Sequence, residues 1–301
     1  MRRRLVWEAE GVALYSLRPH QPLAAPALIA AFDGWVDAGG VATTAASFIA
    51  EGGDVLAVFD ADALIDYRAR RPTLEIEDGV LTEMTWPELN LRRVHAGSRD
   101  LLVLTGPEPD YRWGEFRAAL VEIALQVGVV ESVCLGAIPA TVPHTRPTPV
   151  LVTGKDRRPM PTDPPLPAEH MRVPAAALNL IELHLAEHGI PSVGIWAQVP
   201  HYVAGLYQAG ALALVQRVEA QLGVALSVDA LVEAAREERE RLDAIVAERP
   251  DAREYLAQLE EAEPQQSIPS GAEIAEEVER FLRDWSGERR NPFEDPPADL
   301  G

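Results

Sequence analysis

The chain has 301 residues, of which 27 are lysine or arginine and 47 are aspartate or glutamate, so its formal net charge is −20 at pH 7. This length suggests one large or two small domains, and an apolar content of 47% is enough for a sizeable core, which excludes wholesale disorder. The negative charge argues against nucleic acid or an anionic membrane as the partner. Cys134 is the only cysteine, which excludes a disulfide framework and a cysteine-rich zinc site and favours a cytoplasmic location.

The N-terminal stretch is basic but lacks the apolar run of a signal peptide. No run of apolar residues reaches the length of about 18 that a transmembrane helix needs. We therefore expect neither a signal peptide nor a membrane span.

Residues 27–220 alternate short apolar runs with longer helical periods, which is the pattern of an α/β domain. The runs with the length of buried strands are Ala27–Phe32, Val55–Phe59, Leu101–Thr105, Ser132–Ile138, Val150–Thr153 and Ser192–Val199. The helical periods cover Asp37–Glu51, Trp113–Val127, Val173–His188 and Ala204–Leu222. The sequence thus predicts a sheet covered by helices.

Two further segments, Leu74–Val80 and Val80–Val94, have the pattern of antiparallel strands. The residues Glu77-Asp78-Gly79 between them supply turn chemistry. We therefore predict a mixed sheet rather than a purely parallel one.

Ten of the 25 prolines lie between Pro139 and Pro174. Because proline lacks a backbone donor and has a fixed φ, most of this stretch is expected to be neither helix nor central strand. Loops of this length are often lids, binding segments or interface arms, but a solvated surface excursion is an equal alternative.

After about Val228 the composition changes to alanine, glutamate and arginine at helical spacing, and residues 231–301 contain 20 acidic and nine basic residues. Pro250 and Pro264 should divide this segment into separate helices. The last helix is expected to begin at Ser270 and to carry an apolar stripe from Ile274 to Trp285. We predict an α/β domain over residues 1–226, a helical segment over 227–286 and a disordered tail over 287–301.

The first predicted strand leads into a glycine-rich turn before its helix. This turn contributes the candidate site residues Asp33, Gly34, Trp35, Gly39 and Gly40. In α/β sheets, ligands bind beyond the carboxyl ends of the strands, and helix N-termini favour anions. The spacing is not that of a dinucleotide-binding loop, and Asp37 could cap the helix and repel a phosphate. A capped structural turn and a ligand or partner site are both compatible with this pattern.

Three other loops follow apparent strand ends. They contribute the candidate site residues Glu108, His144, Arg146, His201 and Tyr202. If the strands are parallel, these side chains and Asp33 lie at one end of the sheet, where a carboxylate, histidine and arginine can transfer protons or hold an oxyanion. Each side chain also has a structural alternative, such as a surface ion pair, a helix cap or packing.

Other chemistry is only weakly indicated. His184-Leu185-Ala186-Glu187-His188 matches a zinc motif of one metalloprotease group. However, Gly189 and Pro191 end that helix at once, so no metal is predicted. Cys134 lies inside a strand-like run, which favours a buried and inert thiol, and no cofactor motif is present.

Taken together, several segments resemble the PAC2 family, named after a proteasome assembly chaperone, and in particular its actinobacterial branch. The matching stretches are Ala31–Trp35 with Gly39-Gly40, Val142–Pro147, Gly194–Tyr202, the helix Ala175–Gly189 and the segment Ile268–Gly271. The resemblance covers residues 5–285, and no single stretch is a catalytic signature.

The resemblance implies a three-layer α/β/α domain similar to purine nucleoside phosphorylases, an added helical part and a homo-oligomer, with a trimer favoured. Relatives of this family assist proteasome assembly, so proteasome subunits are a candidate client. Archaeal relatives dock through a C-terminal hydrophobic–Tyr–any motif, whereas this sequence ends Asp299-Leu300-Gly301, which does not support docking of that kind.

We therefore expect a non-catalytic, cytoplasmic, oligomeric interaction protein of the assembly-chaperone type. The alternative is an enzyme or sensor that binds a small anionic or nucleoside-like ligand at the strand ends. A third and weaker alternative is a purely structural oligomer, with subunit contacts made by the proline-rich loop and the last helix.

Overall fold

The computed structural model describes residues 14–154, 157–158, 160, 163–164, 170 and 172–261. The strands are β1 (Tyr15–Leu17), β2 (Ala27–Asp33), β3 (Asp54–Phe59), β4 (Thr73–Glu77), β5 (Val80–Thr85), β6 (Asn90–Ala96), β7 (Arg99–Pro107), β8 (Glu131–Ala140), β9 (Val150–Thr153) and β10 (Ser192–Pro200). The helices are α1 (Val41–Ile49), α2 (Ala61–Leu64), α3 (Trp113–Val127), α4 (Ala177–Glu187), α5 (Gln208–Leu222), α6 (Asp229–Glu248) and α7 (Pro250–Glu261), with a 3₁₀ turn at Ala38–Gly40.

Eight strands form one mixed sheet in the order β1-β3-β6-β7-β2-β8-β10-β9. Its four central strands, β7, β2, β8 and β10, are parallel. The strands on both flanks pair antiparallel with their neighbours. The prediction of a mixed sheet is confirmed, and each of the six predicted apolar runs lies in one of its strands.

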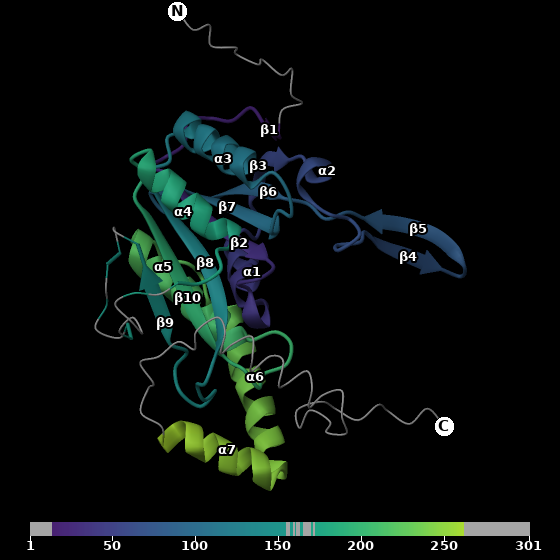
Figure 1. Cartoon of the computed structure of the whole chain (residues 1–301), viewed down its shortest axis with the longest axis vertical. Helices are drawn as coiled ribbons and strands as arrows, with labels where there is room; N and C mark the ends of the chain where they lie inside the picture. The colour runs from purple at the N-terminus through teal and green to yellow at the C-terminus, as the bar shows by residue number, and fades with distance from the viewer. Residues whose placement is uncertain are drawn as a thin grey trace, which may run out of the picture.

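Helices cover both faces of the sheet, because the central strands are apolar on both sides (Figure 1). On β2, Leu28 and Phe32 point to the face covered by α3 and α4. Ile29 and Ala31 point to the opposite face, which is covered by α1 and α5. Helix α6 packs outside α5 and contributes Leu231 to the same core.

The predicted hairpin pairs differently from our expectation. Strands β4 and β5 form a separate two-stranded sheet, while β6, which we had predicted as part of the second strand, belongs to the main sheet. Asp78 and Gly79 form the two-residue turn, both with positive φ. Pro87 lies between β5 and β6; it cannot donate a backbone hydrogen bond, so it interrupts the strand that the alternation suggested.

Other boundaries were also predicted incorrectly. The helix expected at Asp37–Glu51 begins only at Val41, after the 3₁₀ turn. The helices expected from Val173 and Ala204 begin at Ala177 and Gln208. The short elements β1 and α2 were not predicted at all.

The C-terminal segment begins as expected, since Pro250 is the first residue of α7 and separates it from α6. Pro264, the helix predicted from Ser270 and the tail 287–301 lie outside the described residues. None of the helices in the described part of the chain combines the length and the hydropathy needed to cross a bilayer.

A prediction about the core concerns Gly136 on β8, where a Cβ atom would overlap the ring of Trp196 on β10. Gly136→Ala should therefore lower the free energy of unfolding by about 1–3 kcal/mol through overpacking. The control is Gly114→Ala on α3, where a Cβ atom meets open space and the stability should stay unchanged or rise by up to about 1 kcal/mol. Urea denaturation measures both; equal stabilities of the two variants would contradict the packing.

Candidate functional site

The candidate site lies at the end of the sheet where the parallel strands β7, β2, β8 and β10 have their carboxyl termini. We call this end the strand edge. This arrangement confirms the sequence expectation that the loops after these strands lie at one edge. The candidate residues nevertheless fall into two groups with different partners. Asp33 and Glu108 lie near α4 and the segment before the hairpin, whereas His144, Arg146, His201 and Tyr202 lie against α6 and α7.

Glu108 joins the loop after β7 to the start of helix α4. Its Oε1 accepts a hydrogen bond of 2.6 Å from the backbone N–H of Ala177, the first residue of α4. Its Oε2 accepts a longer bond of 3.5 Å from the N–H of Trp35. A Cβ atom on Gly34 would lie 2.9 Å from the same carboxylate, so the glycine allows this close approach. Glu108 thus serves as a cap for α4.

Asp33 and Arg70 line an open cavity of about 620 Å³ at this edge. Arg70 donates from Nη1 to the backbone oxygen of Asp33 at 2.9 Å and to its carboxylate at 3.4 Å. Its Nε lies 3.9 Å from a carboxylate oxygen of Asp110. The cavity is lined by Asp33, Ala69, Arg70, Arg71, Pro87, Pro107 and Asp110. Trp35, with 65% of its surface exposed, lies in the loop after Asp33.

The glycine-rich turn brings Asp37 to the N-terminus of α1. Gly39 and Gly40 both have left-handed backbone conformations, with φ of 61° and 58°. This turn lets the Asp37 carboxylate accept hydrogen bonds from the N–H groups of Ala42 at 2.7 Å and Thr43 at 3.2 Å. Burial raises the pKa of Asp37, and the hydrogen bonds from Thr43 offset part of this change.

The N-terminus of α5 is also occupied by a carboxylate of the chain. Glu238 of α6 accepts hydrogen bonds from the N–H groups of Gln208 at 2.7 Å and Ala209 at 3.3 Å. Burial raises the pKa of Glu238 as well. Three helices that begin at this edge, α1, α4 and α5, therefore each have a protein carboxylate at the position where an anionic ligand would bind.

The second group centres on His144, whose side chain is 1% exposed. Its Nε2 lies 3.2 Å from a carboxylate oxygen of Asp243, which can only accept, so Nε2 carries the proton. In the neutral ring Nδ1 is then an acceptor, and the Tyr202 hydroxyl donates to it at 2.7 Å. The same hydroxyl oxygen accepts the backbone N–H of His144 at 2.8 Å. Burial lowers the pKa of His144, which favours the neutral ring.

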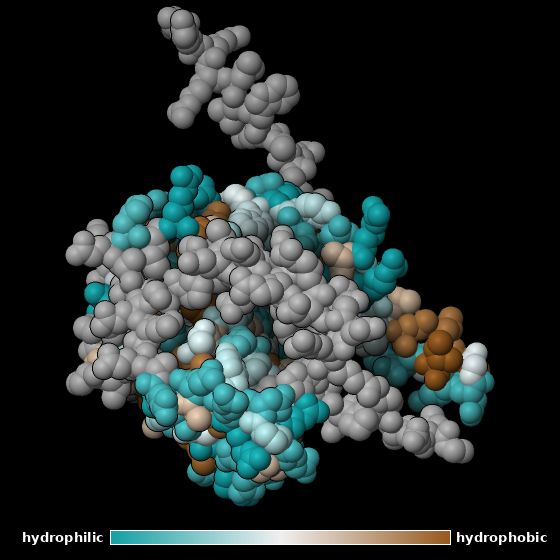
Figure 2. All heavy atoms as spheres, turned by 60° about the horizontal axis from the view of Figure 1, so that its bottom comes forward, coloured by the Kyte–Doolittle hydropathy of each residue, from teal (hydrophilic) through white to brown (hydrophobic). Residues whose placement is uncertain are grey.

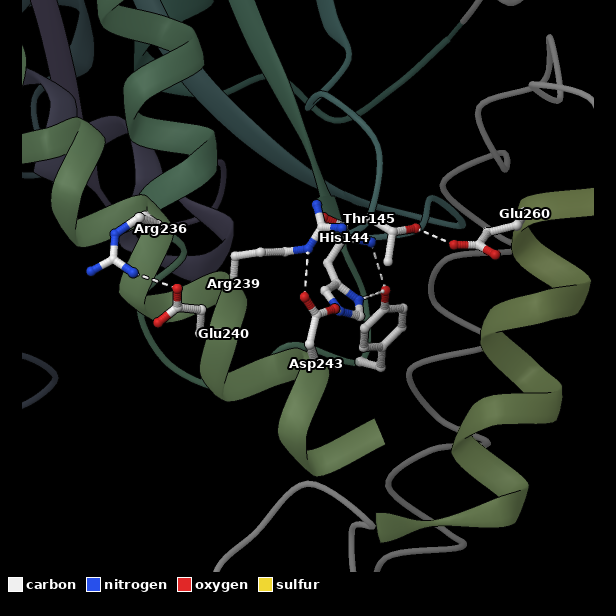
Figure 3. A network of polar contacts seen from close by, with 8 residues as sticks. His144, Thr145, Arg236, Arg239, Glu240, Asp243 and Glu260 are labelled. Carbon is white, nitrogen blue, oxygen red and sulfur yellow. Dashed lines mark hydrogen bonds and ion pairs between the residues drawn. The ribbon is translucent and has the colours of Figure 1, made fainter. Parts of the chain in front are cut away.

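Arg239 completes this cluster from helix α6 (Figure 3). Its Nε pairs with the Asp243 carboxylate at 3.0 Å, and its Nη1 donates to the backbone oxygen of His144 at 3.2 Å. We call His144, Tyr202, Arg239 and Asp243 the histidine clasp. It holds the loop after β8 and the loop after β10 against α6.

Helix α7 is held to the same two loops. Thr145 and Arg146 both donate hydrogen bonds to Glu260, the first to its carboxylate and the second to its backbone oxygen. The Nδ1–H group of His201 donates to the backbone oxygen of Ala140 at 3.2 Å, and its Nε2 accepts from the Tyr255 hydroxyl at 3.0 Å. Arg146 and His201 therefore link α7 to the strand ends.

The other chemical candidates have structural roles. His188 donates from Nδ1 to the backbone oxygen of His184, and His184 lies 3.0 Å from the Glu187 carboxylate. Among the described residues, no group of three or more histidine, cysteine, aspartate or glutamate side chains is placed to hold a metal ion. Cys134 is buried, and burial raises the pKa of its thiol.

Sequence reasoning did not find several of the partner residues. Asp243 and Arg239 stand four residues apart on one face of α6, which is a readable ion-pair spacing, but nothing local points to His144. Arg70 belongs to a run with Arg68 and Arg71 that could have marked a polar surface. Glu182 on α4 was missed too; burial raises its pKa to about 7.

The fold and the site together define an α/β protein whose C-terminal helices are fastened to the carboxyl edge of its sheet. The chain belongs to the PAC2 family, whose family model matches residues 31–246. This confirms the resemblance found in the sequence. The match extends past residue 226, and the proposed division into domains stays a prediction.

Solved structures of actinobacterial proteins are similar to this chain. A Corynebacterium glutamicum protein of unknown function is 33% identical over 89% of this chain and 99% of its own, with a TM-score of 0.76. A PAC2 family protein from Streptomyces avermitilis is 33% identical over 76% of this chain and 99% of its own, with a TM-score of 0.67. A proteasome-assembly chaperone homologue from Mycobacterium tuberculosis is 29% identical over the same shares, with a TM-score of 0.68. Comparison with curated proteins gives no match.

A prediction tests the histidine clasp. Tyr202→Phe removes the hydroxyl that serves both the ring and the backbone of His144, leaving buried polar groups unsatisfied. The free energy of unfolding should fall by about 1–3 kcal/mol. The matched control is Tyr111→Phe, at a half-exposed tyrosine whose hydroxyl bonds the Asp66 carboxylate. Water can replace this partner, so the change should stay within about 1 kcal/mol. Chemical denaturation gives both values, and an unchanged Tyr202→Phe variant would show that the Tyr202 hydroxyl does not stabilise the protein.

Proposed function

We propose that this chain is a non-catalytic interaction protein of the proteasome-assembly-chaperone type that works as a homo-oligomer, with a trimer as the expected form. The observation that carries this proposal is how the polar groups of the strand edge are used. Asp37, Glu108 and Glu238 cap helices. His144 and His201 form hydrogen bonds with side chains of α6 and α7 in the same chain. A catalyst needs an acid or base aimed at a space that a substrate can enter.

The similarity to the mycobacterial proteasome-assembly chaperone homologue supports the choice of client. We propose proteasome subunits as the client of this chain. Trp35 is a suitable contact residue, because it is largely exposed on the loop after β2 and tryptophan is enriched among residues that dominate binding energies. The loop itself is fixed by Glu108 and Asp37, so little ordering would accompany binding.

The assembly test mixes purified α-type and β-type proteasome subunits of the source organism with and without the chain. Core particles should form faster, or at lower subunit concentration, when the chain is present. Native electrophoresis and peptidase activity follow the reaction. No complex with either subunit together with an unchanged rate of assembly would contradict the proposal.

Two variants sharpen this test. Trp35→Ala should weaken subunit binding by about tenfold or more, as expected for a residue that dominates an interface. Leu183→Ala removes an equally exposed apolar side chain on α4 and should leave binding unchanged. Equal effects of the two substitutions would place the client contact away from the strand edge.

The alternative function is binding of a small anionic or nucleoside-like ligand, in line with the expected likeness to purine nucleoside phosphorylases. The observation that favours it is the open cavity beside Arg70 and Arg71, although Asp33 and Asp110 line the same space. Phosphate, nucleosides and nucleotides should then stabilise the chain, by about 2.7 kcal/mol at 100 times the dissociation constant. A thermal-shift series that shows no stabilisation would remove this alternative.

A further inference from the structure

A pocket of about 310 Å³ lies at the opposite end of the sheet from the strand edge, where β8 and β10 begin. Figure 2 turns forward the other end of the molecule, which carries α6 and α7 and whose coloured surface is mostly hydrophilic apart from the β4–β5 hairpin. The pocket is lined by Glu131 and Ser132 at the start of β8, by Gln221 near the end of α5, and by Arg157 and Arg158 after β9. Its volume is at the lower end of the range of small-molecule sites.

The charge around this pocket is opposite to that of the whole chain. Arg99 pairs with Glu131 at 2.8 Å, and Arg158 lies 3.7 Å from the same carboxylate. Arg157 is exposed and forms no hydrogen bond or ion pair with another described residue. Three arginines thus surround one carboxylate, in a chain whose net charge is −20. Such a local excess of positive charge attracts an anion.

Two of these arginines also have a structural role at the end of α5. Arg99 and Arg158 donate to the last backbone carbonyls of this helix, at 2.8 and 2.6 Å, where a cation is favourable. Arg217 of α5 in turn donates to the backbone oxygen of Arg158 at 2.6 Å, which fixes the segment that carries Arg157. Arg157 itself has no such role, so its guanidinium is available to a ligand.

Two buried side chains of the pocket can accept hydrogen bonds. Gln221 is 3% exposed, and its Oε1 receives no hydrogen bond from any described residue. Ser132 is buried beside Ser192, whose hydroxyl donates to the backbone oxygen of Ile190 at 3.2 Å. The 2.5 Å bond between the two hydroxyls is therefore donated by Ser132, and the Ser132 oxygen can still accept. A buried acceptor without a donor costs free energy unless a bound molecule supplies the donor.

We propose that this pocket binds a small sugar phosphate. The phosphate pairs with Arg157, because a guanidinium matches the geometry of a phosphate group. The hydroxyl groups of the sugar donate to Gln221 and Ser132. Hydroxyl groups suit these acceptors better than an ammonium group does, since the surrounding arginines repel a cation. This site goes beyond the proposed function, because it lies away from the strand edge and does not depend on a protein client.

Isothermal titration calorimetry with three probes tests this inference. Glucose 6-phosphate carries both the anion and the hydroxyl groups, whereas glucose lacks the anion and inorganic phosphate lacks the sugar. Glucose 6-phosphate should bind at least about tenfold more tightly than either of the other two, because only this probe engages both Arg157 and the two acceptors. Absence of binding by glucose 6-phosphate, or equal affinity for glucose 6-phosphate and inorganic phosphate, would overturn the inference.

Two variants locate the site. Arg157→Gln should weaken the binding of glucose 6-phosphate by about tenfold or more, since it removes the charge that pairs with the phosphate. Gln221→Met should weaken binding by a similar factor through loss of the acceptor. The melting temperature of the free Gln221→Met protein should stay the same or rise, because a buried polar group without a partner is removed. This readout separates a lost ligand contact from a damaged fold.

The matched control is Arg71→Gln, the same substitution at the cavity of the strand edge. It should bind glucose 6-phosphate like the wild type. If Arg71→Gln abolishes binding while Arg157→Gln leaves it unchanged, the ligand binds at the strand edge and the inference is wrong. Proteasome assembly is measured separately, so failure of this site leaves the proposed function standing.

Discussion

Backbone N–H groups at the start of a helix must be satisfied, and in this protein the chain satisfies them with its own carboxylates. Asp37 serves α1, Glu108 serves α4 and Glu238 serves α5, all at the carboxyl edge of the sheet. A helix N-terminus attracts anions, and at these three helices the anion is a carboxylate of the chain itself. The rest of the edge depends on this arrangement, since Glu108 also fixes the loop after β2 and Glu238 also fixes α6 to α5. At these three helix starts, the position that other α/β proteins leave available to an anionic ligand is filled by a carboxylate of the chain itself.

The elements predicted from sequence are those with strong local patterns. All six apolar runs became strands. Four of them form β2, β7, β8 and β10 in the middle of the sheet, where both faces of a strand are buried, and the other two form β3 and β9 on its flanks. The hairpin turn was readable from Asp78-Gly79. The separation of the hairpin from the main sheet was not, because Pro87 interrupts the strand pattern between β5 and β6. The elements β1 and α2 are too short to leave a periodic signal.

The sequence predicted that the candidate residues lie beyond the carboxyl ends of the parallel strands, but it did not predict the partners of their side chains. A helix cap at Asp37 was one of two alternatives that the sequence left open. In the structure Asp37 bonds to residues five and six positions later, because the left-handed Gly39 and Gly40 bend the chain between them. His144 and Arg146 were considered as proton-transfer or oxyanion groups. Their partners Asp243 and Glu260 could not be recognised in the sequence, since they are about a hundred residues away. Only tertiary structure brings such pairs together, so the sequence around His144 could not predict its contact with Asp243.

The long separation between the partners of the histidine clasp bears on how the protein is made. The strands and helices that precede residue 223 can pair and pack as they leave the ribosome, in the order of synthesis. The loops after β8 and β10 cannot reach their final positions at that stage, because Asp243, Tyr255 and Glu260 have not yet been synthesised. The loops after β8 and β10 are therefore the last of the strand-end loops to gain their partners, and a nascent chain exposes them until α6 and α7 have been synthesised.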